Sequence, residues 1–126
     1  MNTSLGEQGV LTQWHAIAIN DSAFTPPHWE GIVIEDTPGG VVGIAGYYAE
    51  NDQYQHVIVG TTDGKVHEIY WKIGQQGIEG EYILTQFNAN SIVGIAGYYS
   101  ENDKGQHVIV GTKDGNVYDF SLISHL

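Results

Sequence analysis

Imidazole and carboxylate side chains recur in this chain at two matching places. Each histidine begins an apolar, β-branched run, and each follows a turn in which two acids are separated by one residue. Such groups could hold a metal ion, accept hydrogen bonds from a polar ligand, or bond within a β-sheet. The two sets are Glu50, Asp52 and His56, and Glu101, Asp103 and His107.

The spacing of these residues matches no zinc or calcium loop, and acids one residue apart are common in turns. We therefore expect no metal and no cofactor. The favoured interpretation is a histidine that hydrogen bonds across its own sheet, and the Glu-Asn-Asp segments suit solvated turns. Contact of the same residues with a ligand is the alternative, because sugar hydroxyls bind well to carboxylates and amides.

Aromatic residues add a second candidate chemistry. Planar rings stack on the apolar faces of sugars and lose little conformational entropy when they do so. Tyr48 and Tyr99 belong to matching tyrosine pairs, and Trp71 occurs only beside the first set. We include these three in the candidate ligand site, with packing in the core as the competing role.

Catalysis has no support in the sequence. The chain carries no nucleophile motif and no phosphate-binding glycine loop. Glu50 with Asp52 could serve glycoside cleavage, but any acidic turn offers as much. We expect a protein that is not an enzyme, because two near-identical units suit multivalent binding through several weak sites.

An internal duplication determines the expected architecture. When the chain is shifted by 51 residues, 20 of the 28 positions in 42–69 are identical to those in 93–120. The first repeat spans 28–78 and the second spans 79–126, after an extension at 1–27. Glycine contributes 17 of the 126 residues, which is typical of short strands joined by tight turns.

Each repeat predicts four strands. The first is apolar throughout and should be buried on both faces, whereas the third alternates with polar residues as an outer strand would. Asp-Gly pairs predict hairpins between the second and third. The runs are 41–48, 56–61, 65–72 and 81–87, with 30–36 as a weaker counterpart of the fourth and 10–19 as an extra strand. "LTQW" at 11–14 echoes "LTQF" at 84–87.

The sequence therefore predicts an all-β propeller built from two four-stranded blades per chain. The Asp-Gly hairpins resemble the blades of tectonin-like and tachylectin-like propellers, and the two-blade length resembles small oligomeric lectins. This resemblance implies sugar binding. Fucose-binding members of the two-blade group use an arginine, and this chain has none, so a site built from amides, acids and backbone groups is expected.

Two blades leave apolar faces open, so the ring should close by self-association. A trimer with six blades is favoured, and a dimer with five blades follows if 10–19 adds half a blade. The strand at 30–36 should then pair beside the strand at 116–123 of a neighbour, which would remove an exposed sheet edge.

Charge and composition exclude several partners. Fifteen acids against four lysines give a net charge of −11, which disfavours nucleic acid and anionic membranes. Cysteine is absent, and the start of the chain lacks the features of a signal peptide. We expect a cytoplasmic protein, with non-classical release as the alternative. A carbohydrate-binding, lectin-like function is favoured; a protein-interaction scaffold, or a propeller fragment without a small ligand, is the alternative.

Overall fold

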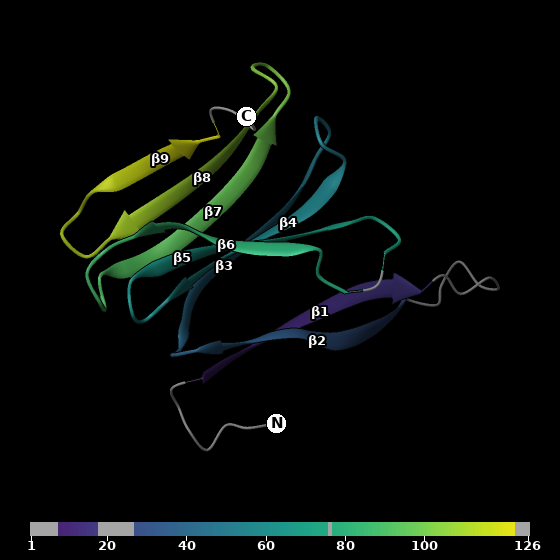
Figure 1. Ribbon diagram of the computed structural model, residues 1–126, viewed down its shortest axis with the longest axis horizontal. Helices are drawn as coiled ribbons and strands as arrows, with labels where there is room; N and C mark the ends of the chain where they lie inside the picture. The colour runs from purple at the N-terminus through teal and green to yellow at the C-terminus, as the bar shows by residue number, and fades with distance from the viewer. Residues whose placement is uncertain (1–7, 18–26, 76, 123–126) are drawn as a thin grey trace.

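The computed structural model describes residues 8–17, 27–75 and 77–122. These residues form nine β-strands and no helix (Figure 1). The strands are β1 Gln8–Ile17, β2 His28–Pro38, β3 Val41–Ala49, β4 Tyr54–Thr61, β5 Lys65–Lys72, β6 Gly80–Gln86, β7 Ile92–Ser100, β8 Gly105–Thr112 and β9 Val117–Ser121. The all-β prediction is confirmed.

The strands make three antiparallel sheets, with the orders β1-β2, β3-β4-β5-β6 and β7-β8-β9. Figure 1 shows the four-stranded sheet between the other two. The described part of a single chain closes neither a barrel nor a propeller. Among these residues, no helix has the length and apolar character needed to cross a bilayer.

Both repeats fold alike in detail. A bulge skips Val42 between β3 and β4, and a bulge skips Val93 at the same place between β7 and β8. Gly64 and Gly115 take positive φ angles of 89° and 92° in the two Asp-Gly hairpins, a conformation that glycine adopts without steric cost. The duplicated sequence therefore specifies the same turns and the same register twice.

The extra strand β1 completes a third copy of part of this pattern. The β1–β2 pairing skips Ile34 next to Leu11, and the β5–β6 pairing skips Leu84 next to Val66. Leu11 and Val66 are both buried. β1 and β2 are thus structural equivalents of β5 and β6, so "LTQW" in β1 and "LTQF" near the end of β6 occupy different positions despite their similar letters.

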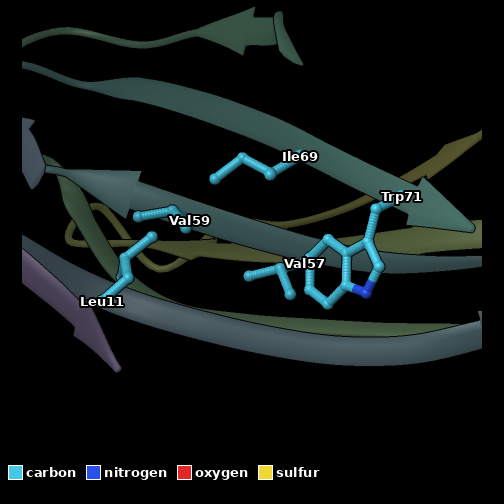
Figure 2. Close-up of a cluster of buried hydrophobic side chains, with 5 residues drawn as sticks. All are labelled: Leu11, Val57, Val59, Ile69 and Trp71. Carbon is cyan, nitrogen blue, oxygen red and sulfur yellow. The ribbon is translucent and has the colours of Figure 1, made fainter. Parts of the chain in front are cut away.

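Two apolar clusters hold the three sheets together. Leu11 of β1 packs against Val57 and Val59 of β4 and against Ile69 and Trp71 of β5, between the first and second sheets (Figure 2). The second cluster lies between the second and third sheets and contains Ile58, Val66, Ile92, Val108 and Val110. Because β4 contributes to both clusters, its residues from His56 onward are buried on both faces.

Two details of the predicted strands are wrong. β3 is not buried on both faces, because β7 covers one face while the two-stranded first sheet leaves the other open. β5 is not an outer strand: it pairs with β4 and β6 and is largely buried, and β6 forms the edge instead. The alternating polar residues of β5, such as Glu68, are buried and hydrogen-bonded rather than exposed to water.

Ile69 of β5, which is buried, and Ile73 of the following turn, which is exposed, allow a test of this packing. We expect Ile69→Ala to lower the free energy of unfolding by about 3 kcal/mol, because the side chain is fully buried between two sheets. Ile73→Ala, at an exposed position, should change it by less than about 0.5 kcal/mol. Urea unfolding followed by circular dichroism measures both, and equal losses would contradict the assigned core.

Candidate functional site

A polar cleft opens between the second and third sheets, with a volume of about 280 Å³. Strands β4, β5 and β6 supply most of its wall, and β8 closes it from the third sheet. Its lining residues are Asp52, Tyr54, His56, Glu68, Tyr70, Tyr82, Gln106 and Leu122. Two carboxylates, an imidazole, an amide and tyrosine rings therefore face one small space.

His56 is the centre of the hydrogen bonds in this cleft. Its Nδ1 bonds to the carboxylate of Glu68, and its Nε2 lies 3.0 Å from Oδ2 of Asp52. The ring of Tyr47 stacks on the imidazole, with centroids 4.9 Å apart and planes 7° apart. Each ring nitrogen thus faces a carboxylate oxygen, an arrangement that suits an imidazole carrying both protons.

The electrostatics of the cleft favour that protonated state. Burial acts to lower the pKa of His56, but the hydrogen bond and charge of Glu68, together with Asp52, outweigh it and raise the pKa. Burial raises the pKa of Tyr82, and the neighbouring Glu68 raises it further. With one imidazolium between two carboxylates, these three groups carry a net negative charge and disfavour anionic ligands.

Gln106 links the two sheets across the cleft. Its side-chain amide donates to Oδ2 of Asp52 at 3.0 Å and to Oδ1 of Asn51 at 3.1 Å. Its carbonyl oxygen accepts a hydrogen bond from the hydroxyl of Tyr47 at 3.0 Å. The hydroxyl of Tyr82 donates to Oε1 of Glu68 at 3.0 Å. These contacts fix the orientation of the acids before any ligand arrives.

The structure brings together only part of the predicted site. Asp52 and His56 lie in the cleft, whereas Glu50 is exposed in the turn beside it. Tyr48 points to the opposite, open face of β3, and Trp71 is buried in the core between the first two sheets. The cross-sheet hydrogen bond predicted for the histidine is present at His56.

The second repeat holds an exposed version of the same arrangement. His107 Nε2 lies 2.9 Å from Oδ2 of Asp103, and its Nδ1 lies 3.3 Å from Oδ1 of Asp119. Tyr98 stacks on the imidazole as Tyr47 does on His56. Glu101 is exposed in the preceding turn, and Tyr99 is half-buried beside β3. Asp103 and Asp119 remain more than half exposed, so this second site is open on one side.

Ser121 places a hydroxyl 3.1 Å from Nδ1 of His107, which aligns a serine, a histidine and the Asp103 carboxylate. The hydrogen bond to Asp103, reinforced by Asp119, raises the pKa of His107. The imidazole therefore keeps its proton to higher pH than a free histidine. The Ser121 hydroxyl and the Asp119 carboxylate both lie within hydrogen-bond distance of the same ring nitrogen, Nδ1.

Sequence reasoning missed six of the residues that line the cleft: Tyr54, Glu68, Tyr70, Tyr82, Gln106 and Leu122. Glu68 and Gln106 sit in strands whose repeated pattern gave no sign of which face each side chain would take. One signal was present, because Glu68 is matched by Asp119 after the 51-residue shift, so a carboxylate recurs there.

A larger cleft of about 770 Å³ lies between the first and second sheets and is mostly apolar. It includes Gln13, Ile32, Gln55 and Trp71. Within the described residues, no group of three or more histidine, aspartate or glutamate side chains is arranged to hold a metal ion. No family model, curated protein or solved structure matches this chain.

Glu35 and Glu81 form a further acidic contact between β2 and β6. Burial, followed by the hydrogen bond to Glu81 and its charge, raises the pKa of Glu35 to about 7 from 4.5. Because the folded-state pKa exceeds the unfolded value, folding favours the protonated acid. The contribution to stability is complete below pH 4.5 and is lost as the pH rises toward 7.

We expect Glu35→Gln to reduce this loss, since glutamine mimics the protonated acid. Between pH 5 and 8, the wild type should lose about 1 kcal/mol more stability than the variant, a value that allows for solvent screening at this half-exposed site. Thermal unfolding across that range measures it. Glu101→Gln, in an exposed turn, is the control and should follow the wild type; a Glu35→Gln curve parallel to both would refute the assignment.

Proposed function

We propose that this chain is a non-catalytic, multivalent binding protein whose cleft at His56 takes a neutral, polyhydroxyl ligand such as a carbohydrate. The observation that carries the proposal is the meeting of tyrosine rings with pre-oriented polar groups in one small cleft. Tyr70 is stacked on Tyr54, and Tyr82 is the tyrosine left to offer a ring face, while Asp52, Glu68 and Gln106 offer acceptors and donors at its wall.

The size and charge of the cleft narrow the ligand class. Its volume of about 280 Å³ lies near the lower end of the range for small-molecule sites, roughly 300 to 1,000 Å³, which suits one or two sugar rings. The net negative charge around His56 disfavours phosphates, sulfates and uronic acids. A neutral sugar can donate its hydroxyl protons to carboxylates and stack its apolar face on a tyrosine.

The same proposal includes a propeller of two four-stranded blades per chain, closed by copies of the chain, with a trimer favoured. Three sheets stacked face to face, with repeated bulges and turns, support it. The predicted pairing of β2 with the last strand of a neighbour has to account for β1, which already occupies one edge of β2. The resemblance to tectonin-like and tachylectin-like propellers and to small two-blade lectins belongs to the same proposal.

Tyr82→Ala tests the cleft. We expect a glycan array of neutral sugars to identify a ligand, and calorimetry to give an affinity roughly five- to thirtyfold weaker for the variant, because a stacking ring contributes on the order of 1–2 kcal/mol. Tyr48→Ala is the matched control: its ring is exposed to 42%, against 45% for Tyr82, and it lies outside the cleft. We expect its affinity to equal that of the wild type.

An array with no signal in any sugar class would overturn the proposal. The second candidate is a protein-interaction scaffold, which the net charge of −11 favours for basic partners. Equal loss of binding in the Tyr48 and Tyr82 variants would place the ligand outside the cleft.

A further inference from the structure

The two repeats are identical at 20 of the 28 positions in 42–69, but their surroundings are unequal. Val66 is fully buried against the third sheet, while Val117, its equivalent, is 74% exposed. Glu68 is buried, while Asp119, at the matching position, is exposed. The third sheet covers the first repeat, and no described part of the chain covers the same face of the second repeat. We call that uncovered face of β7, β8 and β9 the front face.

The contact between the second and third sheets includes an isoleucine that packs against a glycine. A methyl group added to Gly43 of β3 would lie 2.8 Å from Ile95 of β7, so Ile95 fills the space that glycine leaves. Gly94 is the equivalent of Gly43 on the front face, and a methyl group there would meet nothing within 4 Å. Ile44, the equivalent of Ile95, is 52% exposed on the open side of β3.

A tyrosine and a glycine repeat this relation in the opposite direction. A methyl group on Gly97 would lie 3.1 Å from the ring of Tyr47, which therefore rests on Gly97. Gly46 is the equivalent of Gly97, and a methyl group added to it would meet no atom of another sheet within 4 Å. Tyr98 is the equivalent of Tyr47, and its side chain is exposed. The glycine Gly46 lies on the open side of β3, and Tyr98 lies on the front face.

Both unfilled contacts are satisfied by one docking. With a second copy on the front face, its Ile44 meets Gly94 of the first copy, and Tyr98 of the first copy meets Gly46 of the second. We propose that copies of this chain associate head to tail, with the front face of one against the open side of β3 of the next. The contact reproduces the packing of β3 on β7, which the chain already makes within itself.

The same docking would complete the second polar site; this part rests on the proposed function. Within one chain, Gln106 of the third sheet bonds to Asp52 and accepts from Tyr47. Gln55 is the equivalent of Gln106, and it faces the side of the second sheet that docks. Gln55 of a neighbouring copy would bond to Asp103 and to the hydroxyl of Tyr98, which turns the exposed set at His107 into a cleft.

Docking also sets two strands in competition. Leu11 of β1 packs with Val59 of the second sheet, just as Val66 of β5 packs with Val110 of the third sheet. Val117 of β9 is the equivalent of Val66, so it would pack on Val59 of a docked copy, where Leu11 already lies. In the docked pair, β1 of one copy and β9 of the other require the same position on the second sheet. Assembly therefore displaces one of these strands.

Two variants, each altered on one face only, test the proposal. Ile44→Glu places a charge on the open side of β3, and Gly94→Leu fills the space on the front face. We expect the wild type to form assemblies of two or more subunits, and each variant alone to sediment as a 13.8 kDa subunit. An equimolar mixture should give a species of twice that mass, because each variant retains the one face that the other lacks.

Ala89→Glu is the matched control, since Ala89 is exposed in the turn between β6 and β7 and lines neither the cleft between the first and second sheets nor the one at His56; it should assemble as the wild type does. A wild type that remains a single subunit at 100 µM would overturn the proposal. So would a mixture that stays at the subunit mass, or an Ile44→Glu protein that assembles alone, which would indicate a two-fold contact instead. Sedimentation requires no ligand, so failure of sugar binding leaves this result unaffected, and a monomer that binds sugar at His56 would refute assembly alone.

Discussion

Close approach between sheets, which glycine makes possible, is the constraint on which the rest of this structure depends. Ile95 can reach the backbone of β3 only because Gly43 has no side chain, and Tyr47 lies on Gly97 for the same reason. These contacts bring β7 against β3, and that places β8 beside the second sheet. The apolar cluster around Ile58 and Val110 and the cross-sheet bonds of Gln106 both follow from this approach.

Burial of β4 between two sheets also gives the polar cleft its character. His56 is held between two acids in a largely dry environment, where an unpaired charge would be costly. The carboxylates offset that cost, and the tyrosines and the amide take up the remaining acceptors. The matching residues around His107 make similar bonds in water, where each bond contributes less because solvent competes for the same groups. The two sites differ in depth, and also in residue type where Asp119 and Ser121 replace Glu68 and Tyr70.

Much of the fold follows from the sequence, and the reasons are local. Repeated Asp-Gly pairs and β-branched runs predicted the strands and hairpins, because turn geometry and alternation depend on neighbouring residues. The placement of β3 and β5 did not follow, since their burial depends on which sheets lie above and below. Of the candidate site, Asp52 and His56 were found through their repetition. Tyr82 and Gln106 were missed because the cleft joins residues from β6 and β8, whose meeting is set by sheet stacking.

Matching positions of the two repeats should differ in how well they tolerate substitution. In an isolated subunit, substitutions at Gly43 or Val66 would disrupt the packing of two sheets, while the same substitutions at Gly94 or Val117 would meet only water. The second copy would then be free to diverge on its front face. In a head-to-tail assembly both copies are enclosed, and drift is restrained equally in each. On the front face, Gly94, Tyr98 and Val117 are unchanged from their counterparts, whereas Asp119 and Ser121 differ from Glu68 and Tyr70.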